Sequence, residues 1–196
     1  MPGLPGLTPE RDLALASQLF ADERFRPDGL KLYPTMVVEG TELERWYRDG
    51  RYTPYDDQTM VNLMADIKAL VPPYVRISRV LRDIPPQFIV GGLRNSVRDG
   101  VKAILRARGD ACQCVRCREY GHRLRDGWAV GEPGLNRLDY RASEGRELFL
   151  EVTDENDTLF GLLRLRVQDA PPTGFTADGP TAIIRELHVY GAEVPL

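Results

Sequence analysis

The residues best suited to chemistry lie together in one short stretch, Cys112–His122. All three cysteines of the 196-residue chain, Cys112, Cys114 and Cys117, fall within six residues, and His122, one of two histidines, follows five residues later. Three thiolates and an imidazole form a complete tetrahedral ligand set for zinc. Because the C-x-C-x-x-C spacing lets one loop surround an ion, the sequence predicts a zinc site formed by these four residues.

Other interpretations of the cysteine stretch remain open at this stage. Three reduced cysteines without a metal are one alternative, and an iron–sulfur cluster is another, although such clusters usually take four cysteines. The fourth ligand could also be His188, a carboxylate or water instead of His122. No cysteine lies elsewhere, so a disulfide would have to form inside the stretch and leave one thiol over. A closed site of three cysteines and one histidine has no open coordination position and would be structural.

The same region carries a concentration of positive charge. Between Arg76 and Arg125 there are twelve basic and four acidic residues, a net of +8, whereas the whole chain has a formal net charge of −3. Arginine dominates, and its planar guanidinium group suits phosphates and stacks on bases. We therefore expect a surface that binds nucleic acid; the alternative is a solvated basic face paired with the acidic remainder of the chain. The residues expected to contact nucleic acid are Arg76, Arg79, Arg94, Arg98, Lys102, Arg106, Arg108, Arg116 and Arg118.

Length and composition limit the class of protein. At 196 residues and 42% hydrophobic content, the chain can build a packed core as one large domain or as parts of two. No apolar run approaches the ~18–20 residues needed to cross a bilayer, and the N-terminal residues lack the basic and apolar regions of a signal peptide. Clustered cysteines fit a reducing compartment. We therefore expect a cytoplasmic protein without a membrane partner.

The first two thirds of the chain alternate between helical and strand patterns. Apolar residues at helical spacing follow the capping residues Thr8, Thr41 and Asp56, and a further helix begins at Asn95 or Ser96. Strand patterns precede and follow the middle helices, an order that suits a parallel sheet with α/β connections. The expected helices run from Thr8 to Phe20, from Thr41 to Tyr47, from Asp56 to Val71 and from Asn95 or Ser96 to Arg108. The expected strands are Leu30–Val38, with Pro34 as an interruption, and Tyr74–Leu81.

The last third has the pattern of an antiparallel sheet. A turn at Asp154–Asp157 joins two strands as a hairpin. The chain stops six residues after the last strand, so we expect either a segment of a longer protein or a sheet that packs on something else. The expected strands are Leu135–Ala142, Glu147–Thr153, Thr158–Val167 and Thr181–Tyr190.

A family resemblance runs through nearly the whole chain, in eight stretches that keep the family's order. The stretches are Met1–Gly6, Phe25–Thr35, Trp46–Tyr52, Ala69–Pro73, Arg82–Pro85, Cys114–Glu119, Leu162–Arg166 and Arg185–Gly191. Together they resemble the catalytic subunit of the Elongator complex, of the prokaryotic type. This family of tRNA-uridine acetyltransferases joins a radical-SAM domain to an acetyltransferase domain of the GNAT type.

The resemblance implies an α/β fold in three parts. Residues 1–75 would be the C-terminal part of a radical-SAM (TIM-like) partial barrel, residues 76–134 a basic zinc-binding linker, and residues 135–196 the first antiparallel strands of an incomplete GNAT domain. The parent enzyme would modify the wobble uridine of tRNA to a carboxymethyl-type product, with a [4Fe–4S] cluster, S-adenosylmethionine and acetyl-CoA. Its partners would be tRNA, acetyl-CoA and either further Elongator-type subunits or a second copy.

The resemblance also implies roles for particular residues. The three cysteines match the family's zinc loop, with His122 in the place of the fourth ligand. Lys31 would line the cofactor or substrate pocket, or else be a solvated lysine at a strand end. The strand Glu186, Leu187, His188 and Val189 would run alongside the pantetheine arm of acetyl-CoA, while a core or surface role is the alternative for His188.

Two features of the family do not occur in this sequence. The radical-SAM cluster cysteines would precede Met1, and the glycine-rich loop that binds the CoA pyrophosphate would follow Leu196. We therefore expect this chain alone to be inactive, with no catalytic residue assigned. A zinc-stabilised nucleic-acid-binding module without catalysis is the alternative function, and a purely structural interaction segment is a third.

Overall fold

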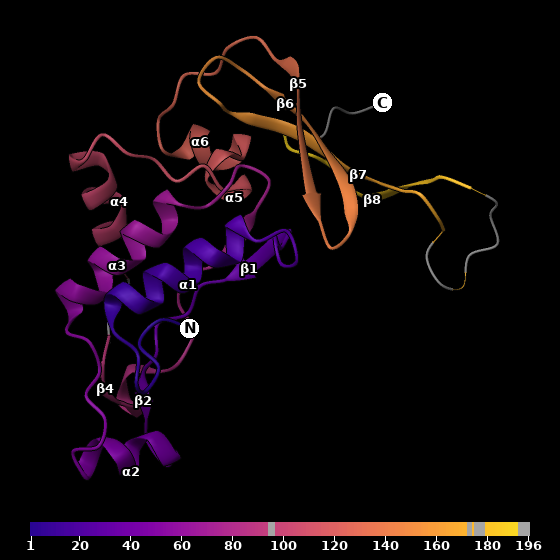
Figure 1. Ribbon diagram of the computed structural model, residues 1–196. Helices are drawn as coiled ribbons and strands as arrows, with labels where there is room; N and C mark the ends of the chain where they lie inside the picture. The colour runs from indigo at the N-terminus through magenta and orange to yellow at the C-terminus, as the bar shows by residue number, and fades with distance from the viewer. Residues whose placement is uncertain (94–96, 172–173, 175–178, 192–196) are drawn as a thin grey trace. The chain divides into compact units, whose positions relative to one another are not determined.

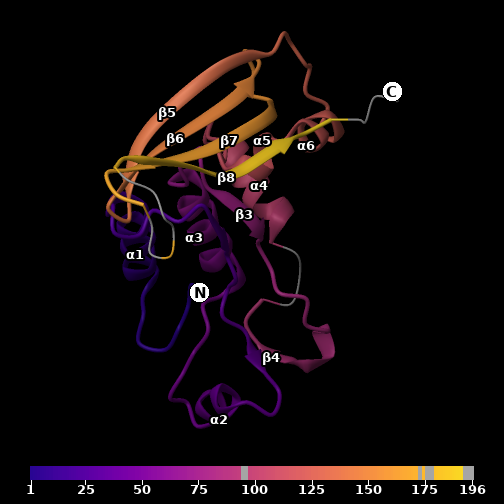
Figure 2. The ribbon, with the colours of Figure 1, turned by 90° about the vertical axis from the view of Figure 1, so that its right-hand side faces the viewer.

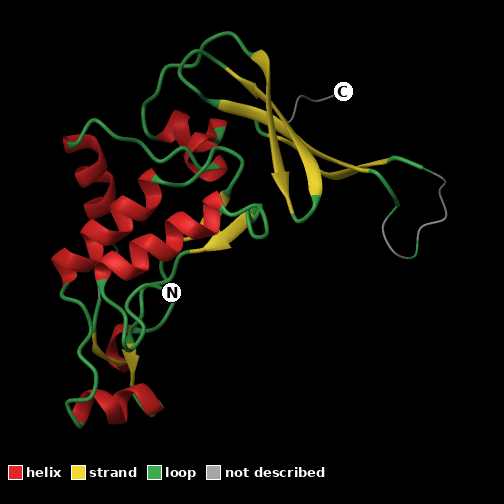
Figure 3. Cartoon of the chain, viewed as in Figure 1, coloured by secondary structure: helices red, strands yellow, loops and turns green. Residues whose placement is uncertain are grey.

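The computed structural model describes residues 1–93, 97–171, 174 and 179–191. The chain divides into two compact units. The first unit comprises residues 1–20 and 28–114, and the second comprises residues 21–27 and 115–196. The elements of both units can be followed in Figure 1, and Figure 3 separates helices from strands.

Four helices belong mainly to the first unit, and three of them begin at the predicted capping residues Thr8, Thr41 and Asp56. The Asp56 carboxylate accepts a hydrogen bond from the Thr59 backbone N–H at 2.7 Å, and the Thr41 hydroxyl accepts one from the Glu44 N–H at 3.3 Å. Both bonds satisfy backbone donors that the first helical turn leaves unpaired. The helices are α1 (Pro9–Ala21), α2 (Glu42–Arg48), α3 (Asp57–Ala69) and α4 (Arg98–Ala107). The predicted caps Asn95 and Ser96 lie outside the described residues.

The strands of the first unit form two small sheets. β1 (Gly29–Lys31) pairs in parallel with β3 (Arg76–Arg79), which confirms a parallel pairing around a helical crossover. β2 (Val37–Val38) pairs antiparallel with β4 (Ile89–Gly91), which follows the 3₁₀ turn Pro86–Phe88.

The stretch Leu30–Val38, predicted as one strand with an interruption at Pro34, forms two separate strands. The structure divides this stretch between two sheets, β1 and β2, on either side of Pro34. Proline has no backbone N–H to donate to a ladder, and the next N–H, that of Thr35, donates to the carbonyl of Pro2 at 2.8 Å. The backbone partners therefore change at the proline.

The core of the first unit lies around α3 and β3. Met60, Leu63, Met64 and Ile67 of α3 are at most 3% exposed. Leu70, the C-cap residue of this helix, is 42% exposed. α4 packs on α3 at Gly100. A Cβ at this position would lie 3.1 Å from a methyl group of Val61, so only a small residue allows the two helices to approach in this way.

The second unit is a four-stranded antiparallel sheet with two short helices. Figure 2 shows the strands in their order β5-β6-β7-β8. Its elements are α5 (Val115–Arg118), α6 (Tyr120–Arg125), β5 (Gly134–Ala142), β6 (Gly145–Thr153), β7 (Leu159–Gln168) and β8 (Thr181–Val189). The predicted hairpin of the second and third strands is confirmed as β6 and β7.

The segment 21–27 belongs to the second unit through contacts with the β5–β6 turn. The Ser143 N–H donates to the Glu23 carbonyl at 2.8 Å, and the Arg26 guanidinium donates to the Arg141 carbonyl at 2.8 Å. Among the described helices of both units, none has the length and apolar character required to cross a membrane.

Candidate metal centre and basic surface

The structure brings the three cysteine thiols together. α4 ends at Ala107, and Gly109, whose φ of +72° favours glycine, follows the C-cap and leads into the cysteine loop. Cys112 and Cys114 are buried, Cys117 is partly exposed, and the three sulfur atoms all lie within 4.8 Å of one another. Thiolates around a tetrahedral zinc ion, with Zn–S bonds of about 2.3 Å, are separated by about 3.8 Å. The donor set and its spacing therefore fit a metal such as zinc.

His122 lies outside the group of three thiols. Its Nε2 is 3.4 Å from a carboxylate oxygen of Glu119, and its Nδ1 is 2.7 Å from a guanidinium nitrogen of Arg125. Burial lowers the pKa of His122, although the carboxylate of Glu119 acts in the opposite direction. The assignment of His122 as fourth ligand remains a prediction, and the ring would have to turn from its present partners to fulfil it.

Three predicted basic residues form a row on α4. Arg98, Lys102 and Arg106 are spaced by four residues, which places them along one side of the helix. Arg98 and Arg106 are exposed and Lys102 is partly exposed, whereas Val101 and Leu105 of the same helix are buried. We call these three residues the α4 basic row.

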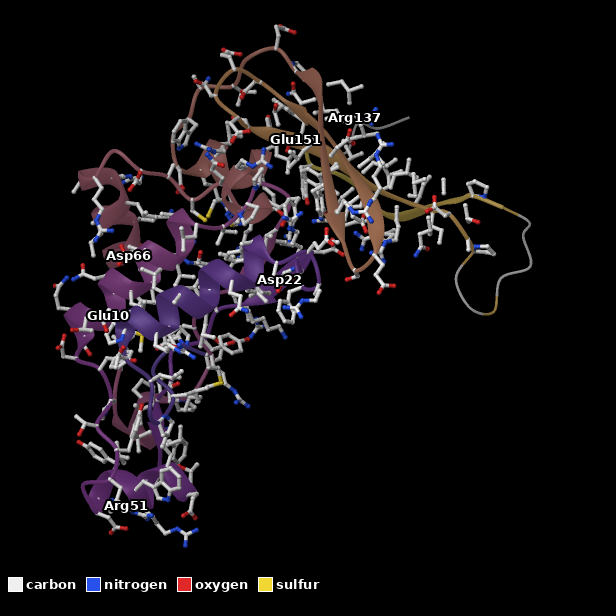
Figure 4. All side chains as sticks on the ribbon, in the orientation of Figure 1. Glu10, Asp22, Arg51, Asp66, Arg137 and Glu151 are labelled. Atoms are coloured by element: carbon white, nitrogen blue, oxygen red, sulfur yellow. The ribbon has the colours of Figure 1, made fainter. Side chains whose placement is uncertain are left out.

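The remaining predicted basic residues differ in their surroundings. Arg108 forms an ion pair with Asp66 of α3, which is labelled in Figure 4. Arg79 pairs with Asp83 at 2.7 Å, and Arg76 and Arg116 are partly exposed. Arg94 lies outside the described residues.

Arg118 does not belong to an accessible basic surface, which corrects the expectation from the sequence. Its side chain is 0% exposed, and its two terminal nitrogens each lie 2.7 Å from a carboxylate, one from Glu151 of β6 and the other from Asp157 of the β6–β7 turn (Figure 4). Burial lowers the pKa of Arg118, but the two carboxylates raise it by a larger amount. The pKa of Arg118 is therefore above its ordinary value, and the guanidinium stays charged. The residue therefore holds α5 against the sheet.

The residues expected near cofactors lie on strands. Lys31 is exposed at the end of β1. On β8, Glu186 pairs with the buried Arg164 at 2.6 Å, and the His188 ring stacks on Tyr190 with 4.5 Å between ring centroids. Leu187 and Val189 are 68% and 79% exposed. Among the described residues β8 pairs only with β7, so the main chain at its outer side has no strand neighbour.

Sequence reasoning missed two groups of buried charge. The Glu147 carboxylate of β6 is almost completely buried and receives Arg166 at 2.8 Å and Arg185 at 2.7 Å. Arg123 of α6 is also buried, with its guanidinium 3.9 Å from the centre of the Trp128 ring. Charged residues at inward positions of the strands could have indicated the first group, whereas local spacing does not predict the second.

Comparisons with known proteins show which class of protein the chain resembles. Residues 27–106 match the Radical_SAM C-terminal domain, so the first unit contains this domain. The entire chain is 63% identical to a tRNA uridine(34) acetyltransferase of Dehalococcoides mccartyi, of which it covers 43%, and 42% identical to Elongator complex protein 3 of Homo sapiens, of which it covers 36%. A solved structure, the archaeal Methanocaldococcus infernus Elp3 with an N-terminal deletion, covers all of the chain with a TM-score of 0.91 at 37% identity, and 47% of that structure is matched.

The chain is therefore homologous over its full length to one part of the Elongator catalytic-subunit family. The family resemblance expected from the sequence is confirmed, and so is the α/β fold class with a radical-SAM C-terminal part followed by an antiparallel sheet. The chain spans less than half the length of these relatives.

Proposed function

We propose that the chain is the tRNA-binding and zinc-bearing part of an enzyme that modifies the wobble uridine of tRNA. The observation that carries this proposal is the 63% identity, over the whole chain, with a protein named tRNA uridine(34) acetyltransferase. The exposed α4 basic row supports the assignment of RNA binding to this part, because guanidinium and ammonium groups neutralise phosphates. The expected boundaries at residues 75 and 134 remain part of the proposal.

The cofactors are proposed in the same way. Cys112, Cys114 and Cys117 would hold zinc, which would cross-link the loop after α4 and leave no position for catalysis if a fourth protein ligand closes the site. The parent enzyme would use a [4Fe–4S] cluster, S-adenosylmethionine and acetyl-CoA, with the outer side of β8 near the acetyl-CoA arm. We propose a cytoplasmic location and either Elongator-type subunits or a second copy as partners.

A binding module without chemistry is the second candidate function. The basic row and the thiol group would suffice for it, because neither requires a reacting substrate. The experiment measures transfer of radiolabel from labelled acetyl-CoA to tRNA by the chain joined to its natural neighbouring domains. It separates the two candidate functions, since a pure binding module would transfer no label.

Charge reversal of the α4 basic row tests the proposed RNA surface. The triple variant Arg98→Glu, Lys102→Glu and Arg106→Glu should bind tRNA at least tenfold more weakly. The slope of log affinity against log salt concentration should become shallower by about 1 for each lost phosphate contact. Fluorescence anisotropy of labelled tRNA over a salt series measures both quantities.

Arg137→Glu is the matched control. Arg137 is an exposed residue of β5 that pairs with Asp139 at 2.8 Å, so its reversal changes the net charge without touching α4 (Figure 4). It should leave the salt slope almost unchanged. The control changes the net charge by −2 and the triple variant by −6, so a loss of binding free energy in the control equal to one third of that in the triple variant would show that net charge, and not the row, governs binding.

A further inference from the structure

The strongest unexplained feature of the second unit is a tryptophan that lies on a buried arginine. The Arg123 guanidinium is 3.9 Å from the centre of the Trp128 ring, well within the range of a cation–π interaction. Arg123 is 7% exposed, whereas Trp128 is 43% exposed. One side of the indole is therefore backed by a cation while much of the ring remains accessible.

Arg123 differs from the other two buried arginines of the unit. Arg118 pairs with the carboxylates of Glu151 and Asp157, and Arg164 pairs with that of Glu186. Among the described residues Arg123 has no ion pair, and its Nε has no hydrogen-bond partner. A buried cation without a carboxylate partner carries a desolvation cost, and the face of the indole offsets part of that cost.

The position of the indole is set by backbone contacts on both sides. The Trp128 N–H donates to the Arg123 carbonyl at 3.1 Å, after a turn at Gly127 with a φ of +81°. Beyond the indole, the Asn156 side chain donates to the Ala129 carbonyl at 3.3 Å, which holds the loop to the β6–β7 turn. The ring is thus presented on a fixed loop.

The neighbourhood of the ring is apolar at one place and cationic at another. Leu124 and Val130 are 52% and 39% exposed, and Arg125 is exposed one residue beyond Leu124. Together with Arg123 they place apolar side chains and two guanidinium groups within five residues of Trp128 in sequence. The carboxylates nearest in the same loop and the turn bonded to it are those of Asp126, Glu132 and Glu155. An accessible aromatic ring with an exposed guanidinium three residues away in sequence complements a ligand that is flat, aromatic and linked to a phosphate.

We propose that Trp128, backed by Arg123, is a stacking platform for an unpaired nucleotide of the RNA substrate. A base would stack on the accessible part of the indole, and the adjoining phosphate would lie near Arg125. The inference depends on the proposed function only in taking RNA as the ligand. A base pair inside a continuous helix is excluded as the occupant because both of its faces are covered by neighbouring base pairs.

The two tryptophans of the chain provide the experiment. Trp46→Phe leaves Trp128 as the single fluorophore, and Trp128→Phe leaves Trp46, which lies on α2 in the first unit. Short single-stranded oligouridine should quench the Trp46→Phe protein, with the midpoint of quenching equal to that of binding measured by anisotropy. A fully paired RNA duplex should not quench it, and the Trp128→Phe protein should show little quenching with either RNA.

Trp128→Ala measures the contribution of stacking to affinity. Loss of one base–aromatic stack should weaken binding of oligouridine by about 5- to 150-fold. Because stacking involves no counterion release, the factor should be the same at every salt concentration, whereas Arg125→Gln should change the salt slope. If the alanine variant does not fold, the quenching of Trp46→Phe still decides the question.

The outcomes separate this inference from the proposed function. Salt-dependent binding of tRNA without quenching of Trp128 would overturn the platform and leave the proposed RNA surface intact. Equal quenching by duplex and single strand would overturn the assignment to an unpaired nucleotide. Absence of any RNA binding by the wild-type chain would overturn both proposals.

Discussion

At the scale of single residues, arginine has three distinct roles in this chain. Arg98 is exposed in the α4 basic row, Arg118 is buried between two carboxylates, and Arg123 is buried beneath an indole. The side chain is the same in each case, and only its partners differ. A count of basic residues along the sequence therefore overstates the charge that is accessible to RNA.

The thiol group leads to a prediction for one residue. Cys114→Ser should abolish stoichiometric zinc binding, because Cys114 is fully buried within the group and zinc-binding free energy in such a loop is also folding free energy. A metal at one hundred times its dissociation constant contributes about 2.7 kcal/mol, so the melting temperature should fall by roughly 5–10 °C. Metal analysis and thermal unfolding of the same sample measure the two effects.

Gln113→Ala is the control for this variant. Gln113 is exposed and lies between two of the cysteines, so its loss changes the loop without removing a thiol. A strong chelator should make the wild-type chain melt like Cys114→Ser and should have little effect on Cys114→Ser itself. Unchanged metal content and melting temperature in Cys114→Ser would refute the zinc assignment.

At the scale of elements, the β6–β7 hairpin depends on one buried carboxylate in its turn. Asp154 is 7% exposed and accepts hydrogen bonds from the N–H groups of Gly131 at 2.9 Å, Asn156 at 3.0 Å and Thr158 at 2.8 Å. Asp154→Ala leaves these donors without their acceptor and should lower the free energy of unfolding by about 1–3 kcal/mol. Urea unfolding at pH 7 followed by circular dichroism measures the change.

The ionisation of Asp154 determines how the free energy of unfolding lost in Asp154→Ala depends on pH. Burial raises the pKa of Asp154, but the hydrogen bonds from the N–H groups lower it by a larger amount. The pKa of Asp154 in the folded chain therefore lies below the ordinary value of 3.8. A group with a lowered folded pKa contributes stability above its unfolded pKa and loses that contribution as the pH falls through the folded value. The difference between wild type and Asp154→Ala should therefore be constant from pH 5 to 7 and should shrink below about pH 4. A constant difference at all pH values would show that ionisation of Asp154 does not matter.

Local chemistry predicts several elements well. Thr41 and Asp56 begin α2 and α3 as expected, since an N-cap hydrogen bond involves only neighbouring residues. The β6–β7 hairpin is equally local, because its turn and both strands are continuous in sequence. These features require no knowledge of the rest of the fold.

Features that depend on distant partners were not predictable in the same way. The stretch Leu30–Val38 has the composition of one strand, but β1 pairs with β3 and β2 with β4, and each partner lies more than forty residues away. The burial of Arg118 depends on a carboxylate of β6 that no local pattern connects to α5. The grouping of the three thiols was predictable because a six-residue loop limits their separation, whereas the fourth ligand is not limited in this way.

At the scale of the whole molecule, each compact unit has its own buried core and one tryptophan. The first unit contains Trp46 and the core around Met64 and Ile77, and the second contains Trp128 and the core around Phe149 and Leu159. The two tryptophans can report the unfolding of the two units separately.

Removal of the buried guanidinium of Arg118 should destabilise the second unit alone. Arg118→Met leaves the carboxylates of Glu151 and Asp157 without their counter-ion, and because both are partly exposed we expect a loss near 3 kcal/mol, the lower end for a broken buried ion pair. In the Trp46→Phe background the urea midpoint reported by Trp128 should fall. In the Trp128→Phe background the midpoint reported by Trp46 should stay the same.

Arg118→Lys is the matched control, because it keeps the charge but not the two-pronged geometry that reaches both carboxylates. The urea midpoint that Trp128 reports for Arg118→Lys should lie between the midpoints of the wild type and Arg118→Met. A parallel fall of the Trp46 midpoint would show that the chain unfolds as one cooperative body, and the division into two compact units would then have no thermodynamic counterpart. A fall of the urea midpoint reported by Trp128 alone would mean that the ion pair stabilises the second unit and contributes nothing to the stability of the radical-SAM C-terminal domain.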